Sequence, residues 1–184
     1  MLILGTGATG KVGRHLIATL LDRPRFSQAR IRVLCHNRVL APTERLGIIR
    51  GSIADRAVAE GAIAGVSHVV HLATCKETPA DVMDVTVKGL FWLLEAFRMS
   101  PTARQFILIG GDAAVGHFFH AHDGPITEAT PHRAYPGCYA LSKVLEEVIV
   151  EQYAIQYGMN VCCLRAPWIM EKDDFKYSLS FGDD

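Results

Sequence analysis

A tyrosine and a lysine four positions apart are the first residues in this chain with a clear chemical use. Tyr139 and Lys143 lie in the segment CYALSK, and residues four apart share one face of a helix. A free phenol has a pKa of about 10 and is a poor base at neutral pH, but a neighbouring ammonium is expected to lower that pKa. The pair can therefore exchange a proton with a substrate hydroxyl. The same spacing is also found on ordinary helix faces, so other features have to support this interpretation.

A glycine-rich turn near the start of the chain provides such support. The stretch GTGATGKVG begins at Gly5 and satisfies the pattern GxGxxG. Its glycines at Gly7, Gly10 and Gly13 also satisfy GxxGxxG. Glycines let the backbone turn tightly and approach a pyrophosphate, whose charge then lies at the N-terminus of the following helix. An apolar strand precedes the turn and a helical pattern follows it, as the motif requires, so the sequence predicts a dinucleotide site. With a nicotinamide bound there, Tyr139 can exchange its proton while a hydride is transferred.

The end of the expected second strand bears on which dinucleotide would bind. Enzymes that use NAD often carry an acid there, about twenty residues beyond the glycine turn, which contacts the ribose 2′-hydroxyl. This chain has the segment CHNR at that place, with His36 and Arg38, and no acid follows until Glu44. These two side chains suit a 2′-phosphate, to which Lys11 or Arg14 can add, and this favours NADP over NAD. If all four are simply solvated surface residues, the choice between NAD and NADP stays open.

Alternating strand and helix patterns would position these motifs. Strands are expected at residues 2–4, 31–35, 47–50, 69–73, 106–109 and 161–164, and helices at 12–21, 55–64, 81–99 and 139–157. This alternation predicts an α/β domain over residues 1–167, with a doubly wound, Rossmann-type parallel sheet and helices on both faces. Residues 168–184 would be the start of a substrate-binding lobe, which is largely absent, or a truncated tail. The connection at 116–136 is about twenty residues long, which is unusual and indicates a functional loop.

The composition excludes several classes of protein. The chain has 184 residues, of which 49% are hydrophobic and 21% charged, a normal balance for a globular domain. Lys plus Arg and Asp plus Glu both number 19, so no basic excess indicates a nucleic-acid partner. No apolar run approaches the roughly 20 residues that span a bilayer, and the first residues lack the pattern of a signal peptide. The five cysteines are odd in number and form no CxxC pair, which indicates reduced thiols and a cytoplasmic protein. No membrane partner is expected, because no segment of the sequence could span a bilayer.

Six segments match those of one known family, in the family's order and over nearly the whole chain. They are TGATGKVG at 6–13, VVHLA at 69–73, LLEA at 93–96, PITE at 125–128, YALSK at 139–143 and LRAP at 164–167. The chain therefore resembles the extended short-chain dehydrogenase/reductase family, in its group of NAD(P)-dependent sugar epimerases and dehydratases. The resemblance implies an NAD(P)-dependent oxidoreductase, epimerase or dehydratase. Its small-molecule substrate would carry a secondary alcohol or ketone, with a nucleotide sugar as the family's usual substrate.

The resemblance also implies roles for individual residues. Tyr139 is then the proton acid and base, while Lys143 lowers its pKa and holds the nicotinamide ribose. The residues expected to contact the cofactor are Gly7, Ala8, Thr9, Gly10, Lys11, Val12, Gly13, His36, Arg38, Ser52, Ile53, Leu72, Ala73, Thr74, Tyr139, Lys143, Ala166 and Pro167.

The chain departs from the family's pattern at several positions. A Ser or Thr usually follows the fifth strand and bonds the reacting oxygen, but Gly111 stands there, and Asp112 beside it is expected to point elsewhere. Removing one such donor costs about 10²–10³-fold in rate. Ser52 replaces the acid that usually contacts adenine, and Thr86 stands where Asn is common. The change at Gly111 favours a second hypothesis, an NAD(P)-binding sensor or regulatory protein that has lost turnover.

Histidines offer a metal-binding alternative. His117, His120 and His122 lie close to Asp123, a spacing that can seat a metal ion. They have no cysteine partner and lie where the family has a substrate-facing loop, so a loop or pocket role is favoured and no metal site is expected. His71 lies on an apolar strand and is expected to pack in the core with a satisfied nitrogen.

The helices expected at 81–99 and 139–157 carry apolar residues on more than one face. The apolar positions include Leu90, Phe91 and Leu94 in the first helix and Leu145, Val148 and Ile149 in the second. A helix that is apolar on two sides is buried on two sides. The family resemblance implies that these helices pair across a two-fold axis, so a homodimer is expected.

Overall fold

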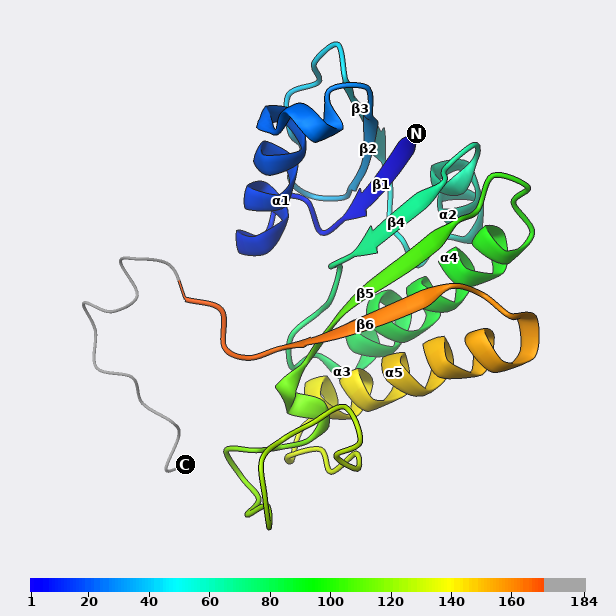
Figure 1. Cartoon of the computed structure of the whole chain (residues 1–184). Coiled ribbons are helices and arrows are strands. Elements are labelled where there is room, and N and C mark those ends of the chain that lie inside the picture. Colours follow the sequence, from blue (N-terminus) through cyan, green and yellow to red (C-terminus); the bar gives the residue numbers. More distant parts are fainter. Residues whose placement is uncertain (171–184) are drawn as a thin grey trace.

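Six parallel strands form one sheet in the order β3-β2-β1-β4-β5-β6 (Figure 1). The structure is a computed structural model that describes residues 1–170. The strands are β1 (Leu2–Thr6), β2 (Arg30–Cys35), β3 (Leu46–Arg50), β4 (His68–His71), β5 (Gln105–Gly111) and β6 (Val161–Ala166). The strand order reverses between β1 and β4, and in open α/β sheets ligands bind beyond the carboxyl ends of the strands at such a point.

Helices connect the strands as the sequence predicts. They are α1 (Lys11–Asp22), η1 (Pro24–Phe26), α2 (Arg56–Ile63), α3 (Pro79–Asp81), η2 (Val82–Lys88), α4 (Gly89–Arg98), η3 (Asp112–Ala114) and α5 (Cys138–Tyr157). The helix expected at 81–99 consists of α3, the π-helical η2 and α4 in direct succession. The carboxylate of Asp55 caps α2 by accepting the N–H groups of Ala57 and Val58. Helix α5 ends at Gly158, whose φ of 62° lies in the left-handed region.

Two apolar clusters hold helices on both faces of the sheet, which confirms the predicted doubly wound fold. The larger cluster packs α2, α4 and α5 on one face, with Leu94 and Phe106 fully buried at its centre. The smaller cluster packs α1 against β1, β2 and β3 through Ile17, Ile31 and Val33. In Figure 1, α1 lies on the side of the sheet away from α4 and α5. The core therefore fixes the strand ends at which the sequence motifs lie.

Some strand ends differ from those expected, and the differences matter for the site. The strand expected at 69–73 ends at His71, so Leu72 and Ala73 belong to the connection that follows. The strand expected at 106–109 continues to Gly111 because β6 pairs with it along its length, up to the pair Gly111 and Ala166. Gly111 is thus the last residue of β5, directly at the carboxyl edge of the sheet.

The proposed boundary between a domain over residues 1–167 and a lobe or tail at 168–184 stays a prediction. Of the proposed tail at 168–184, residues 171–184 lie outside the described part of the chain. The described helices include none that is long and apolar enough to cross a membrane.

Candidate active site

A cavity of about 660 Å³ opens at the carboxyl ends of the central strands and contains both sequence motifs. The glycine turn forms one part of its wall, and Tyr139 and Lys143 form another. The predicted cofactor residues that line it are Gly7, Gly10, Lys11, Val12, Gly13, Leu72, Thr74, Tyr139, Lys143, Ala166 and Pro167. The fold therefore brings together two motifs that are about 130 residues apart in sequence.

The other predicted residues lie around this cavity. Ala8 and Thr9 belong to the glycine turn, where Ala8 is buried, and Ala73 follows Leu72 in the connection after β4. His36 lines a separate small depression with Asn37, Arg50 and Gly51. Arg50 had not been singled out from the sequence, because only the fold brings the ends of β2 and β3 together.

Three further residues have surroundings that bear on their expected roles. Arg38 is exposed on the loop after β2. The Ser52 hydroxyl accepts the N–H of Ala54 at 3.2 Å and so stabilises its own turn. Ile53 is buried in the larger apolar cluster, beside Gly89, at which an added Cβ would approach Ile53 to 2.7 Å.

The glycine turn has the geometry that close approach of a pyrophosphate requires. Gly7 has a φ of +64°, and a Cβ added there would lie 2.7 Å from the carbonyl of Leu72. A Cβ at Gly13 would collide with the backbone of Gly7 and Ala8. Helix α1 starts after Gly10 with no acid in its first turn and no side-chain cap among the described residues. Its N-terminal N–H groups and positive dipole end therefore suit an anion in the cavity.

The N-terminus of α5, which carries Tyr139, is held by a carboxylate from a distant loop. Oε2 of Glu77 accepts the backbone N–H of Cys138 at 3.0 Å and that of Tyr139 at 3.3 Å. Gly137 makes room for Glu77, since a Cβ there would approach Oε1 to 2.8 Å. The pKa of Glu77 is lowered, chiefly by a hydrogen bond from the Cys138 thiol. The sequence analysis missed Glu77 because no local pattern links residues this far apart.

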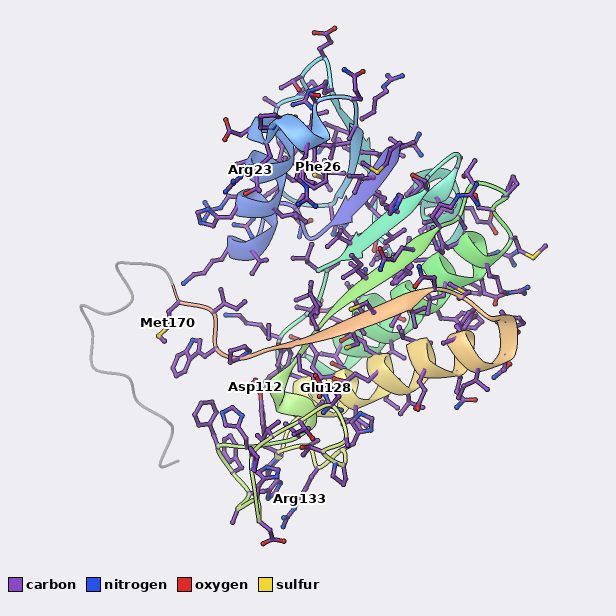
Figure 2. The ribbon with its side chains drawn as sticks, in the orientation of Figure 1. Arg23, Phe26, Asp112, Glu128, Arg133 and Met170 are labelled. Atoms are coloured by element: carbon purple, nitrogen blue, oxygen red, sulfur yellow. The ribbon has the colours of Figure 1, made fainter. Side chains whose placement is uncertain are left out.

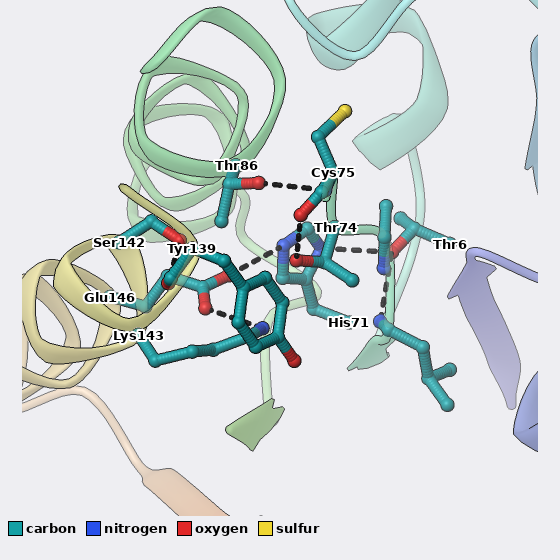
Figure 3. A network of polar contacts seen from close by, with 11 residues as sticks. Thr6, His71, Thr74, Cys75, Thr86, Tyr139, Ser142, Lys143 and Glu146 are labelled. Atoms are coloured by element: carbon teal, nitrogen blue, oxygen red, sulfur yellow. Dashed lines mark hydrogen bonds and ion pairs between the residues drawn. The ribbon is translucent and has the colours of Figure 1, made fainter. Parts of the chain in front are cut away.

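Tyr139 and Lys143 share one face of α5, but the lysine has a second partner (Figure 3). Nζ of Lys143 lies 5.5 Å from the centre of the Tyr139 ring and donates to Oε2 of Glu146 at 2.8 Å. The pKa of Tyr139 is raised by burial and by the carboxylates of Glu146, Asp112 and Glu77. Burial and these three acids act against the lowering of the pKa that we expected from Lys143, and that role of Lys143 stays a prediction.

Gly111 and Asp112 both adjoin the phenol. A Cβ added at Gly111 would lie 3.8 Å from Oη of Tyr139. Asp112, which we expected to point elsewhere, lines the same cavity at the start of η3, where the long loop begins (Figure 2). Its Oδ2 lies 3.4 Å from Nδ1 of His117, and burial raises the pKa of this carboxyl. The expectation was wrong because the alternation of the strand ends at Gly111 and Asp112 begins the turn η3.

Hydrogen bonds to α5 and β6 hold the long loop that follows η3. Buried Glu147 accepts from Nε2 of His132 at 2.9 Å and from Nε of Arg165 at 3.0 Å. The Arg165 guanidinium also donates to the carbonyl of Thr127 at 3.2 Å. The anchored loop contributes Phe118, Phe119 and Tyr135 to the wall of the cavity, and the segment after β6 contributes Trp168 and Ile169.

The three histidines of the long loop each have different neighbours. His117 faces Asp112, whereas Nε2 of His120 lies 3.1 Å from the carbonyl oxygen of Ala134. His122 lies with Asp123 in a different depression from the cavity. Within residues 1–170, no group of three or more His, Cys, Asp or Glu side chains is arranged to hold a metal ion.

Comparison with known proteins identifies the family to which the chain is similar. The model of the NAD dependent epimerase/dehydratase family matches residues 3–170. Dihydroflavonol 4-reductase of Zea mays is 25% identical over 86% of this chain and 50% of its own length.

Solved structures share the fold of this chain. A short-chain dehydrogenase/reductase superfamily protein from Agrobacterium tumefaciens with bound NAD superposes with a TM-score of 0.75 and 29% identity, over 90% of this chain and 48% of that one. UDP-glucose 4-epimerase of Thermus thermophilus, in complex with NAD, has a TM-score of 0.74 and 23% identity, over 90% of this chain and 54% of its own. The chain therefore spans about half the length of the proteins it matches.

Proposed function

The chain belongs to the NAD dependent epimerase/dehydratase family, and from this premise we propose that it is an NAD(P)-dependent oxidoreductase, epimerase or dehydratase. One observation carries the proposal: a single cavity is walled by the glycine turn, by Tyr139 and by Lys143. A dinucleotide with its pyrophosphate at the turn could extend its nicotinamide toward the phenol. The substrate would be a small molecule with a secondary alcohol or ketone.

Different residues of the chain would bind the cofactor and transfer the proton. The backbone N–H groups at the start of α1 would bind the pyrophosphate, and Lys143 would hold the nicotinamide ribose. When bound, the dinucleotide supplies a hydride acceptor or donor. Tyr139 would take the proton from the substrate hydroxyl as a carbonyl forms, and return it when a carbonyl is reduced. Its raised pKa keeps the phenol protonated at neutral pH, which suits the direction in which it donates.

The cofactor is NAD or NADP, and we favour NADP. His36 and Arg50 line one depression at the ends of β2 and β3, and exposed Arg38 lies on the adjoining loop. These three side chains can meet a 2′-phosphate, while no carboxylate stands at the end of β2 to bind a 2′-hydroxyl. NAD is bound in the neighbours described above, so the preference for NADP would be a property of this chain.

The cavity walls favour a substrate that contains a ring. Phe118, Phe119, Tyr135 and Trp168 line the same cavity as Tyr139. Aromatic side chains stack on sugar rings and on aromatic rings. We therefore propose a ring-bearing secondary alcohol or ketone, and a nucleotide sugar is one member of that class.

The proposal extends to a cytoplasmic homodimer through α4 and α5. Leu141, Val148 and Ile155 are exposed on α5 at intervals of seven residues, so they lie along one face of the helix. Phe91 of α4 is exposed as well. A matching stripe on a second copy would cover these side chains.

A second candidate, a dinucleotide-binding sensor without turnover, rests on Gly111. Its position beside the phenol lacks the hydroxyl that would bond a reacting oxygen. The two candidates share the cofactor site and differ only in catalysis.

Calorimetric titration of NAD⁺ and NADP⁺ into the purified chain tests the shared part of the proposal. We expect one molecule bound per chain, with NADP⁺ the tighter ligand. Val12 lines the cavity in the first turn of α1, so Val12→Asp places a negative charge where the pyrophosphate would lie and should weaken binding tenfold or more, as an order of magnitude. Val12→Thr, similar in shape but uncharged, is the control and should bind within a few-fold of the wild type. Equal binding by both variants would contradict the assigned position of the pyrophosphate.

A further inference from the structure

A row of buried polar groups runs beneath the proposed site, and the proton transfer by Tyr139 does not use it (Figure 3). It begins at Thr6, the last residue of β1, whose Oγ1 accepts the backbone N–H groups of Leu72 and Ala73, both at 3.1 Å. The same oxygen lies 2.8 Å from Nδ1 of His71. Because the two N–H groups occupy the acceptor capacity of the hydroxyl, its O–H must donate to Nδ1. His71 is therefore a neutral imidazole with its proton on Nε2.

This proton faces a carboxylate. His71 is fully buried, and burial together with the nearby Lys143 lowers its pKa to about 3. Nε2 of His71 lies 3.8 Å from Oε1 of Glu146, and neither atom has a hydrogen-bond partner within residues 1–170. The separation exceeds a hydrogen bond, but a shift of less than an ångström, in order of magnitude, would close it.

The second oxygen of Glu146 holds the lysine. Oε2 accepts from Nζ of Lys143 at 2.8 Å, and the exposed fractions of the two side chains are 0% and 3%. An apolar residue would fill this buried position without desolvating a charge, whereas an acid there depends on a cationic partner. Lys143 is consequently fixed by a carboxylate three residues along its own helix, on the side away from bulk water.

We propose that Glu146 is a positioning residue, whose carboxylate is oriented by His71, anchors the Lys143 ammonium and opposes the effect of that ammonium on Tyr139. The consequence for catalysis rests on the proposed function, because only there does Tyr139 exchange a proton. That Glu146 anchors the Lys143 ammonium does not depend on the proposed function. The proposal assigns chemistry to two buried groups, His71 and Glu146, that neither motif includes.

The charges around Glu146 determine how its effect would depend on pH. On α5 it is near Lys143 and Glu147, on β4 it faces His71, and from β6 the thiol of Cys163 is close enough to interact with it. Burial raises the pKa of Glu146 to about 7, against the opposing effect of Lys143. Above that pH the carboxylate adds negative charge near the phenol.

The phenol of Tyr139 also has other acidic neighbours. Asp112 and Glu77 raise its pKa in the same direction as Glu146 does. The effect of Glu146 must therefore be measured as a difference between variants, with these two acids unchanged.

The test is a titration of Tyr139 by nuclear magnetic resonance, with tyrosine labelled at the ring carbon that bears the hydroxyl and the signal assigned with Tyr139→Phe. In the wild type, the Tyr139 signal should show a small step near the pKa of Glu146, about 7, before the phenol itself ionises. Glu146→Gln keeps an oxygen for Lys143 but removes the charge. The step should then vanish, and the midpoint of the phenol should fall by about one unit.

Two matched variants separate charge from packing. Glu151→Gln removes an exposed acid of the same helix and should leave both the step and the midpoint unchanged. Glu146→Asp restores the charge on a shorter side chain and should restore the step. A folded Glu146→Gln protein with the wild-type step and midpoint would overturn the proposal. If that variant does not fold, a wild type without a step near neutral pH would overturn it equally.

These titrations need neither cofactor nor substrate. A chain that fails to bind NAD⁺ or NADP⁺ would refute the proposed function and leave the Glu146 result standing. If a substrate is found, turnover can be measured as a function of pH. The part of this pH profile that reports the ionisation of Tyr139 should shift to lower pH in Glu146→Gln. The dinucleotide affinity of this variant should stay within a few-fold of the wild type. A fall in dinucleotide affinity without a shift of the profile would show a purely structural role.

Discussion

A Cβ atom added at Gly111 would lie 3.8 Å from the phenol oxygen of Tyr139 and the same distance from Cγ and Cδ of Lys143. The φ of Gly111 is −158°, which is extended backbone that any residue adopts. The last residue of β5 therefore faces the phenol with room for a side chain but without a hydroxyl.

Gly111→Ser should raise turnover. The new hydroxyl would bond the reacting oxygen beside Tyr139, and one such donor changes kcat by about 10²–10³-fold where it is well placed, so we expect a gain of at least about tenfold. The measurement is kcat with a substrate found in a screen of ring-bearing secondary alcohols and ketones, nucleotide sugars included. Gly111→Ala adds the Cβ alone and should give no gain. Equal rates for the two variants would show that a hydroxyl here has no catalytic use.

Tyr139→Phe should reduce turnover by about 10²–10⁴-fold, because it removes the proton donor and acceptor. Dinucleotide affinity should change by no more than a few-fold, since the backbone of the glycine turn provides most of that binding. Tyr157→Phe, at the far and more exposed end of α5, is the control and should keep full activity. If Tyr139→Phe retained wild-type kcat, the assigned proton transfer would be wrong.

Arg50→Ala should weaken NADP⁺ binding by about tenfold and leave NAD⁺ binding unchanged, because a lost charge-assisted bond affects only the 2′-phosphate. Arg38→Ala should act in the same direction. Calorimetry with both dinucleotides measures the difference, and NAD⁺ serves as the internal control. A parallel loss for both dinucleotides would mean that these arginines support the fold or the adenosine rather than the 2′-phosphate.

The stability of the contact between α4 and α5 should depend on acid pH through Glu95. Its carboxylate accepts two hydrogen bonds from Arg98, each at 2.7 Å, and one from Tyr153 at 2.5 Å, and the bonds from Arg98 are the chief cause of a pKa lowered to about 2. Because the folded-state pKa lies below the ordinary value, the stabilisation is present above about pH 4.5 and is lost as the pH falls toward 2.

Glu95→Gln should therefore lower the free energy of unfolding by about 1 kcal/mol at neutral pH, a value reduced for solvent screening, and by much less near pH 2. Thermal unfolding across this pH range measures it. Glu60→Gln, in an exposed pair with Arg56, is the control and should show little change at any pH. A deficit for Glu95→Gln that stayed constant from pH 7 to about pH 2 would contradict the assignment.

Local patterns predicted the fold well. Strand and helix periodicity is read within a few residues, so the parallel sheet, the glycine turn before α1 and the helix that carries Tyr139 and Lys143 were all predicted. The family resemblance placed Gly111 after the fifth strand, whereas the structure makes it the last residue of β5. The exact strand ends were less accurate, because pairing with β6, a long-range interaction, decides where β5 stops.

The hydrogen-bond and ion-pair partners within the site could not be predicted from local sequence patterns. Glu77 caps a helix that starts about sixty residues later, and Thr6 accepts a backbone N–H from the connection after β4, about sixty-five residues away. Neither contact leaves a local signature. Glu146 lies next to the YxxxK motif, but only the structure shows that this acid points into the core toward His71. The pKa of Tyr139 is raised first by the burial of its own phenol and then by the charges of Glu146, Asp112 and Glu77, which the spacing of Tyr139 and Lys143 does not reveal.

The most direct test of the account is a crystal structure of the chain with NADP⁺ or NAD⁺ bound. We predict the pyrophosphate against the backbone N–H groups between Gly7 and Gly13. We predict the reactive carbon of the nicotinamide about 3–3.5 Å from the reacting carbon of a substrate bonded to Oη of Tyr139. A dinucleotide bound elsewhere, or one whose nicotinamide points away from Tyr139, would contradict the claim that one cavity joins the cofactor to the proton donor.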